Sequence, residues 1–214
     1  MEKRSNGLDV NALDLGLRIP KAAGVKNVFL YLPFTLGAGA VTDLGKLLKE
    51  TEIATAIFNE TTDVAASSSD VSKFLIKTSS MQLSCWILDI NADIKFTDVK
   101  AAGGDDYRPS GTILEFGSQV FDLGADEGER YIRFRINLTK SGLTAFFTRY
   151  DPPDRGLLSG YEEIEVVDFR LNEARNLPRA VLNNMCAGFV LKQINYLALM
   201  ALIVDMGRIR SLQR

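Results

Sequence analysis

Apolar and polar residues alternate most regularly over Tyr131–Leu138. Every second position from Ile132 onward is apolar, whereas Arg133 and Arg135 stand between these positions. A period of two is typical of a strand whose one face lies in the core while the other faces water. The segment therefore predicts one strand of an antiparallel sheet.

The segment Glu162–Phe169 shows the same alternation, with Glu163 and Glu165 at the polar positions. If this strand is a neighbour of the first one, its glutamates face Arg133 and Arg135 across the sheet. Cross-strand pairs of opposite charge stabilise a sheet by about 0.2–1 kcal/mol each. We interpret the four charges as such a ladder rather than as a charged binding stripe.

Several other short segments have the composition and length of strands. Sequential strands joined by short turns favour a meander or a small sandwich over βαβ units. Gly and Pro mark 101–111 as a loop, and 140–142 reads as a hairpin turn. The predicted strands are Asn27–Leu32, Gln82–Ile90, Asp93–Val99, Thr112–Phe116, Gln119–Leu123 and Leu143–Tyr150, and Ile53–Phe58 is either a strand or a continuation of a helix.

A glycine-containing loop follows the first of these strands, and Thr42–Glu50 then predicts a helix with Thr42 as its N-cap. A strand, a glycine loop and a helix start can present backbone N–H groups to a phosphate. Gly37 and Gly39 are the candidate positions. However, a dinucleotide-binding fingerprint requires glycine where Thr42 stands, and a P-loop requires glycine where Ala40 stands. We therefore interpret the loop mainly as a connection.

The chain changes character after residue 175. Asn176 and Pro178 predict the start of a helix, and the run Gln193–Val204 is apolar apart from its first residue and Asn195. A membrane-spanning helix needs about 20 apolar residues, and this run is shorter. Burial against the sheet, contact with a partner or a second copy, and membrane contact through 180–204 all remain open. The candidate contact residues are Phe189, Tyr196, Leu197, Met200 and Ile203.

Together these patterns predict an α+β fold. Residues 1–175 form a mostly antiparallel β-rich domain with an N-terminal strand–loop–helix unit. Residues 176–214 form a C-terminal apolar helix that packs on this domain or mediates assembly. The 214 residues are 46% hydrophobic and 24% charged, which is ordinary for a globular protein.

The composition excludes several kinds of chemistry. The chain has no histidine and only two cysteines, so His-dependent triads and Cys/His zinc sites are ruled out. Its 25 basic and 27 acidic residues give a net charge of −2, which provides no overall attraction to nucleic acid. Cys85 and Cys186 fit two buried thiols better than a disulfide framework. We expect a cytoplasmic location, with membrane association as the alternative.

Carboxylate chemistry needs no histidine. Asp89, Asp93 and Lys95 lie close together in the sequence, and Asp93-Ile94-Lys95 has the Asp-x-Lys form of metal-dependent nucleases. In such sites the carboxylates hold Mg²⁺ and the lysine stabilises developing charge. A second such triplet, Asp98-Val99-Lys100, shows that the pattern arises readily in a chain so rich in charge.

We therefore expect a non-catalytic interaction or assembly module that needs no cofactor. It would act on a protein partner or a second copy through its β-layer and its apolar C-terminal helix. Two alternatives follow from the same residues. One is a metal-dependent phosphodiesterase or hydrolase that uses Mg²⁺ at the carboxylate cluster, and the other is a protein attached to a membrane through the C-terminal helix.

Overall fold

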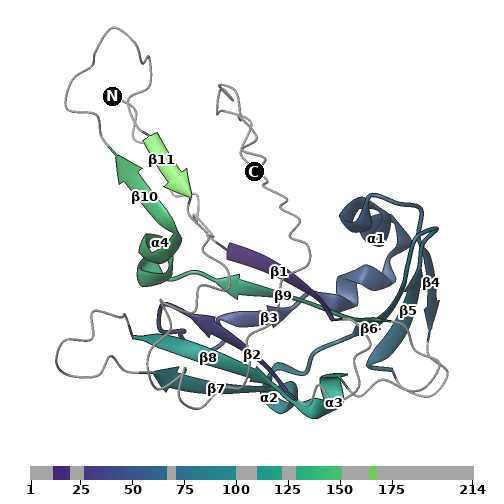
Figure 1. The fold of residues 1–214 in the computed structure, drawn as a ribbon, viewed down its shortest axis with the longest axis horizontal. Coiled ribbons are helices and arrows are strands. Elements are labelled where there is room, and N and C mark those ends of the chain that lie inside the picture. The colour runs from purple at the N-terminus through teal and green to yellow at the C-terminus, as the bar shows by residue number, and fades with distance from the viewer. Residues whose placement is uncertain are drawn as a thin grey trace, which may run out of the picture.

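The computed structural model describes residues 12–19, 27–66, 71–99, 110–121, 129–150 and 164–167. Within these ranges the chain forms three β-sheets with short helices at their ends and on one face (Figure 1). This part of the protein is an α+β structure built mostly from antiparallel strands, as the sequence predicts. The C-terminal helix expected over 176–214 lies outside the described residues, and the domain boundary at residue 175 stays a prediction.

The largest sheet has six strands and is organised around β9. Its strands run in the order β1 (Ala12–Ile19), β9 (Glu129–Asn137), β6 (Gln82–Trp86), β5 (Lys73–Lys77) and β4 (Asp63–Ala66), and β3 (Val41–Asp43) also pairs with β9. β1 lies along one edge of β9, while β6 and β3 share the other edge. All pairings are antiparallel except that of β6 with β9.

The second sheet has three antiparallel strands in the order β2 (Val28–Leu32), β8 (Gly111–Phe116) and β7 (Ile94–Val99). Its inner face packs on the β9 side of the large sheet. The alternating residues of the predicted 131–138 strand lie in this interface, because Ile132, Phe134 and Ile136 are fully buried. The main core between the sheets also contains Val28, Leu32, Phe34, Val41, Trp86, Leu88, Ile94, Leu114, Phe116, Val120 and Phe121.

A second, smaller core lies on the opposite face of the large sheet, where a 3₁₀ helix (Gly45–Lys49) and α1 (Thr51–Phe58) cover β5 and β6 (Figure 1). Ala54 of α1 is fully buried there. Asn59 ends the helix in the left-handed conformation, with φ of 53°, which asparagine tolerates better than most residues. The segment 53–58, left open by the sequence, is therefore helical. The buried members of this core are Leu48, Ala54, Phe74, Ile76, Leu83, Cys85 and Tyr131.

Three local predictions are wrong. The segment 119–123 was expected as a strand, but α3 (Ser118–Phe121) is a helix that buries Val120 and Phe121. The hairpin turn expected at 140–142 lies within α4 (Lys140–Phe146), which takes the first residues of the strand expected over 143–150. The strand itself is reduced to β10 (Phe147–Tyr150), which pairs with β11 (Ile164–Val167).

The expected helix over 42–50 is also corrected. Thr42 lies in β3, where it pairs with Arg135, and is not an N-cap. The carboxylate of Asp43 instead accepts the backbone N–H groups of Gly45 and Lys46, at 3.1 and 3.0 Å. The same carboxylate accepts the N–H of Leu88 at 3.0 Å. Because Asp43 organises this turn, the chain leaves β3 as a 3₁₀ helix and becomes α-helical only at Thr51.

The predicted charge ladder does not form at Glu165, which lies on a strand that does not pair with β9, and Glu163 lies outside the described residues. β11 pairs with β10, so Glu165 lies opposite Arg149. Arg135 lies opposite Asp14 of β1, and its guanidinium donates two hydrogen bonds to that carboxylate, at 2.6 and 2.9 Å. The alternation was interpreted correctly, but the partner strand comes from the N-terminal end of the described chain.

Candidate functional site

Asp93 is the most connected of the carboxylates that the sequence singled out. It lies at the end of α2 (Ile90–Asp93) and is only 7% exposed. Its Oδ2 accepts the indole N–H of Trp86 and the backbone N–H of Asp89, both at 2.9 Å. Its Oδ1 accepts the side-chain amide of Gln119 at 3.2 Å. These donors come from β6, α2 and α3, so the carboxylate joins three elements.

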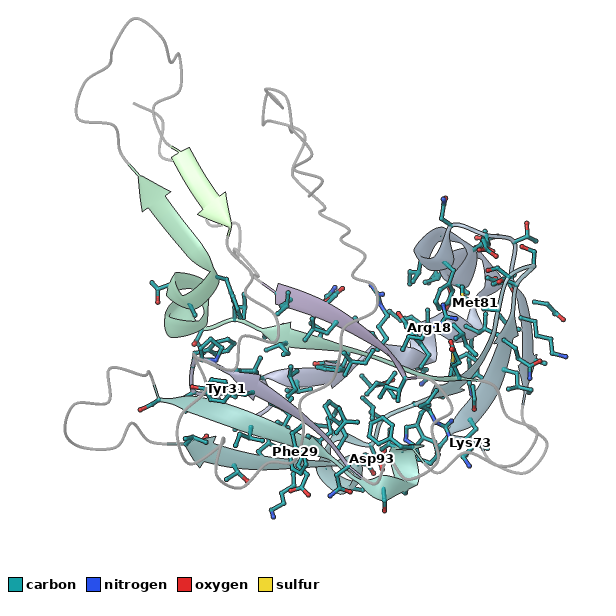
Figure 2. All side chains as sticks on the ribbon, viewed as in Figure 1. Arg18, Phe29, Tyr31, Lys73, Met81 and Asp93 are labelled. Atoms are coloured by element: carbon teal, nitrogen blue, oxygen red, sulfur yellow. The ribbon has the colours of Figure 1, made fainter. Side chains whose placement is uncertain are left out.

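Trp86 lies at the centre of a group that we call the Trp86 cluster, which consists of Lys73, Ser84, Trp86, Asp93 and Arg130. Asp93 and Lys73 are both labelled along the lower side of the view in Figure 2, where Figure 1 shows α2 and α3. The ammonium of Lys73 and the guanidinium of Arg130 lie 5.2 and 5.3 Å from the indole ring centre. Such cation–π contacts are favourable when the cation is desolvated.

Arg130 is fully buried within this cluster. Its Nη1 donates to the hydroxyl of Ser84 at 2.8 Å. On the opposite face of β6, burial raises the pKa of the Cys85 thiol to about 12, although Arg130 acts in the other direction. Because nucleophilic cysteine chemistry requires the thiolate, this thiol is inert at neutral pH.

The other two members of the predicted carboxylate cluster serve different purposes. Asp89 is the N-cap of α2, and its side chain accepts the backbone N–H groups of Asn91 and Ala92, at 3.1 and 3.3 Å. The side chain of Lys95 is 74% exposed on β7 and lies 3.7 Å from the carboxylate of Glu115. The three residues are near one another in the chain, but their charged groups do not converge on one point.

No group of three or more metal-ligating side chains occurs among the residues that the structure describes. Asp93 already accepts three protein hydrogen bonds on its two oxygens, from the Trp86 indole, the Asp89 backbone and the Gln119 amide. The cluster is therefore built to hold the two sheets together at this end. The donor set does not resemble the oxygen-rich shell that Mg²⁺ prefers.

Gly37 and Gly39 lie in an exposed turn between β2 and β3, closed by a hydrogen bond from the N–H of Ala40 to the carbonyl of Gly37, at 3.2 Å. Gly39 has a positive φ of 71°, which explains the glycine there. The turn leads into a strand and not into a helix. The geometry of a phosphate-binding loop, in which N–H groups at a helix start face the ligand, is absent from this turn.

The outer face of the second sheet carries exposed apolar surface. Phe29 and Tyr31 project from β2 on this side, and Phe29 is 41% exposed (Figure 2). Tyr31 packs with Val99 and Ile113 in a small cluster. Glu115 lies beside Phe29 and accepts a hydrogen bond from the side chain of Asn27, at 2.7 Å. This face therefore carries exposed aromatic surface beside charged side chains.

β1 offers a different kind of surface, an open strand edge. Its eight residues pair with β9 on one side, and no described strand pairs with its other side. A strand edge presents unpaired backbone donors and acceptors to any further strand. The alternating leucines of β1 are only partly buried, although they pack against the main core. Figure 1 shows β1 running beside β9 at the boundary of the sheet.

Sequence reasoning missed both β1 and the Trp86 cluster. The alternation of Leu13, Leu15 and Leu17 with polar residues or glycine was present in the sequence and could have identified the strand. No comparable signal identified Arg130 as buried, since arginine is seldom found in a core. The five apolar contact residues predicted between Phe189 and Ile203 lie outside the described residues.

No helix in the described part of the chain is long and apolar enough to span a membrane. Comparison of the chain with protein-family models, with curated proteins and with solved structures gives no match.

Proposed function

We propose that this protein is a non-catalytic interaction or assembly module. It binds a protein partner or a second copy of itself through its β-layer and its apolar C-terminal segment. The open edge of β1 is the observation that supports this function most directly. No strand among the described residues pairs with this eight-residue edge, which carries a row of half-buried leucines. Strand addition at such an edge is a recurrent mode of protein recognition.

The state of the acidic candidates also supports a non-catalytic role. Asp89 caps a helix, Asp93 holds Trp86, and Lys95 lies on the surface beside Glu115. A catalytic carboxylate must reach a substrate or a metal ion. The carboxylates of Asp89 and Asp93 both accept hydrogen bonds from protein groups instead. No described contact favours the Mg²⁺-dependent alternative, and the proposed module uses no cofactor.

The C-terminal residues Phe189, Tyr196, Leu197, Met200 and Ile203 remain part of the proposal as contact residues. They repeat at positions that a helix would place on neighbouring turns, and they belong to the most apolar stretch of the chain. A helix with such a face can dock in a groove of a partner or of a second copy.

The test is a mass measurement by analytical ultracentrifugation on the full chain and on a version that ends before Pro178. We expect the full chain to form a species larger than one copy, and the shortened version to associate more weakly. If both versions are equally soluble and strictly monomeric at every concentration, the self-assembly role is wrong.

A thermal-shift screen tests the metal-dependent alternative, because any ligand that binds only the folded state raises its stability. A clear shift with millimolar Mg²⁺ would contradict the absence of a cofactor and would support the metal-dependent alternative.

A further inference from the structure

The sequence of β1 is complementary to itself when it is read in the opposite direction. We propose that the partner at its open edge is β1 of a second copy of this chain, paired antiparallel and centred on Gly16. In this register Asp14 lies opposite Arg18 of the second copy, and Arg18 lies opposite its Asp14. This inference rests on the proposed assembly function and specifies the contact that performs it.

The two faces of β1 have different compositions. Leu13, Leu15, Leu17 and Ile19 point to the side of the main core and remain partly exposed. Asp14 and Arg18 lie on the other face, on either side of Gly16. Pairing centred on Gly16 places Leu15 opposite Leu17 of the second copy, so the leucine rows of the two copies form one continuous apolar surface. Further burial of these side chains provides the apolar driving force.

Other registers are less favourable. A shift of one residue in either direction places Leu15 and Leu17 opposite a charged residue or glycine, because side chains alternate between the two faces. A shift of two residues leaves both charges without an opposite charge across the new pair of strands. A shift of four residues in one direction places Asp14 opposite Asp14 of the second copy. A shift of four in the other direction places Arg18 opposite Arg18 of the second copy. Like charges directly opposite each other destabilise a sheet. The charge pattern therefore selects one register.

The charges already fixed within each copy extend this complementarity. Arg135 of β9 makes two hydrogen bonds to Asp14, and Arg18 pairs with Glu129 of β9. Across the proposed dimer the row would read Arg135, Asp14, then Arg18 and Glu129 of the second copy. Positive and negative groups alternate along this row, so each inner charge lies between two opposite charges. The effect of Asp14 is visible within one copy, where it raises the pKa of Arg135.

The symmetry of this contact limits the size of the assembly. Both copies use the same strand, so the β1 edge of each copy is paired in the dimer. No β1 edge is left for a third copy, and the interface is closed. A pairing of β1 with a different edge would leave one edge open at each end and would propagate. The proposed contact therefore produces a discrete dimer with a continuous sheet, and not a fibre.

Two charge-reversal variants of the full chain test the register. Asp14→Lys places two positive charges opposite each other at both symmetric positions of the dimer, and Arg18→Glu places two negative charges there. Each variant alone should raise the dimer dissociation constant by about tenfold, since attraction becomes repulsion at two contacts. In an equimolar mixture, lysine of one copy faces glutamate of the other, and the unchanged Arg18 faces the unchanged Asp14. Sedimentation should show that the mixture recovers most of the dimer.

Lys95→Glu is the matched control. It reverses an exposed strand charge and breaks the contact of Lys95 with Glu115, but it lies on the second sheet. We expect it to leave the dimer unchanged. Unfolding curves on every variant show whether each chain is folded. If a reversal unfolds the chain, the neutral substitutions Asp14→Asn and Arg18→Gln replace it, and each should weaken the dimer about threefold.

The possible failures are distinguishable. If both reversals keep the wild-type mass, or if the mixture stays as dissociated as the separate variants, the β1 contact is wrong. The assembly function still stands in that case, provided that the chain cut before Pro178 dissociates. If the wild-type chain is a monomer at every concentration, both the β1 contact and the self-assembly role are wrong.

Discussion

At the scale of single residues, Asp93 contributes to stability in a way that its sequence context does not reveal. The sequence identified it as an acidic residue two positions before a lysine, at the start of a predicted strand. In the structure the strand begins one residue later, at Ile94, and the carboxylate turns inward to Trp86. A local motif specifies which groups are close in sequence. The burial of a side chain depends on elements from other parts of the chain, here β6 and α3.

Replacement of Asp93 by alanine should lower the free energy of unfolding by about 3 kcal/mol, because the buried indole N–H of Trp86 and the N–H of Asp89 lose their acceptor. Asp89→Ala removes only an exposed helix cap and should cost about 1 kcal/mol. Urea unfolding of the two variants measures both values. Equal losses would show that Asp93 acts as no more than a cap.

Cys85 gives a prediction for alkaline pH. Burial raises the pKa of its thiol from the ordinary 9.0 to about 12, so the folded state holds this proton more tightly than the unfolded state. The resulting stability is fully present below pH 9 and is lost as the pH rises toward 12. Between pH 9 and 10 we expect the free energy of unfolding to fall by about 1 kcal/mol from this group.

Urea unfolding of the wild-type chain and of Cys85→Ala at pH 8, 9 and 10 tests this effect. The variant should lose less stability over the range, although its stability at pH 8 is lower. Burial also raises the pKa of Tyr131, which acts in the same direction above pH 10. Parallel curves for the two chains would contradict the role assigned to the thiol.

At the scale of elements, β1 depends on a close contact at Gly16. A Cβ at this position would collide with the hydroxyl of Tyr131 and lie 2.9 Å from its Cζ. Tyr131 cannot move freely because its ring packs edge-on against Phe58, with ring centres 5.2 Å apart. The absence of a side chain at Gly16 therefore leaves room for the ring of Tyr131 between β1 and β9.

Gly16→Ala should lower the free energy of unfolding by about 1–3 kcal/mol and should weaken hydrogen-exchange protection in β1 before other strands. Gly37→Ala is the matched control, since nothing lies within 4 Å of a Cβ there. We expect that change to stay within about 0.5 kcal/mol of the wild type. Similar effects for both substitutions would refute the role of Tyr131.

The elements were predicted well where one pattern dominated and poorly where several competed. β9 was correctly identified because an apolar period of two runs through Ile132, Phe134 and Ile136. The segment 118–121 has too few residues to show a period, so its apolar residues fitted a strand or a helix equally well. Thr42 had the chemistry of an N-cap, but pairing with β9 outweighed that local preference.

At the scale of the whole molecule, the neighbours of each strand were the least predictable feature. The sequence favoured consecutive pairing, whereas β9 pairs with β1, β3 and β6 from earlier parts of the chain. Strand pairing depends on which apolar faces can be buried together, and several arrangements satisfy the same alternation. The candidate surface on β1 was missed for the same reason, because an edge exists only after the order of the sheet is known.

Trp86, the single tryptophan, reports on the contact between the two sheets. It lies in the large sheet, while its partners Asp93 and Gln119 flank the second sheet. If these sheets form one cooperative unit, urea unfolding followed by Trp86 fluorescence and by circular dichroism of the strands should have the same midpoint. A fluorescence change at clearly lower urea would show that the sheets separate before they unfold.

The pairing of β1 with β9 also has a consequence for the order of events during synthesis. Ile19 lies opposite Arg130, so the ribosome must add 111 residues after the first strand before its partner strand begins to pair. At 5–20 residues per second this interval lasts about 5–20 s. Throughout that time the leucines of β1 have no sheet to cover them, and a nascent chain on a neighbouring ribosome carries the same self-complementary strand. Chaperone binding to the emerging N-terminal region would therefore affect the yield of folded protein more than it affects the stability of the finished fold.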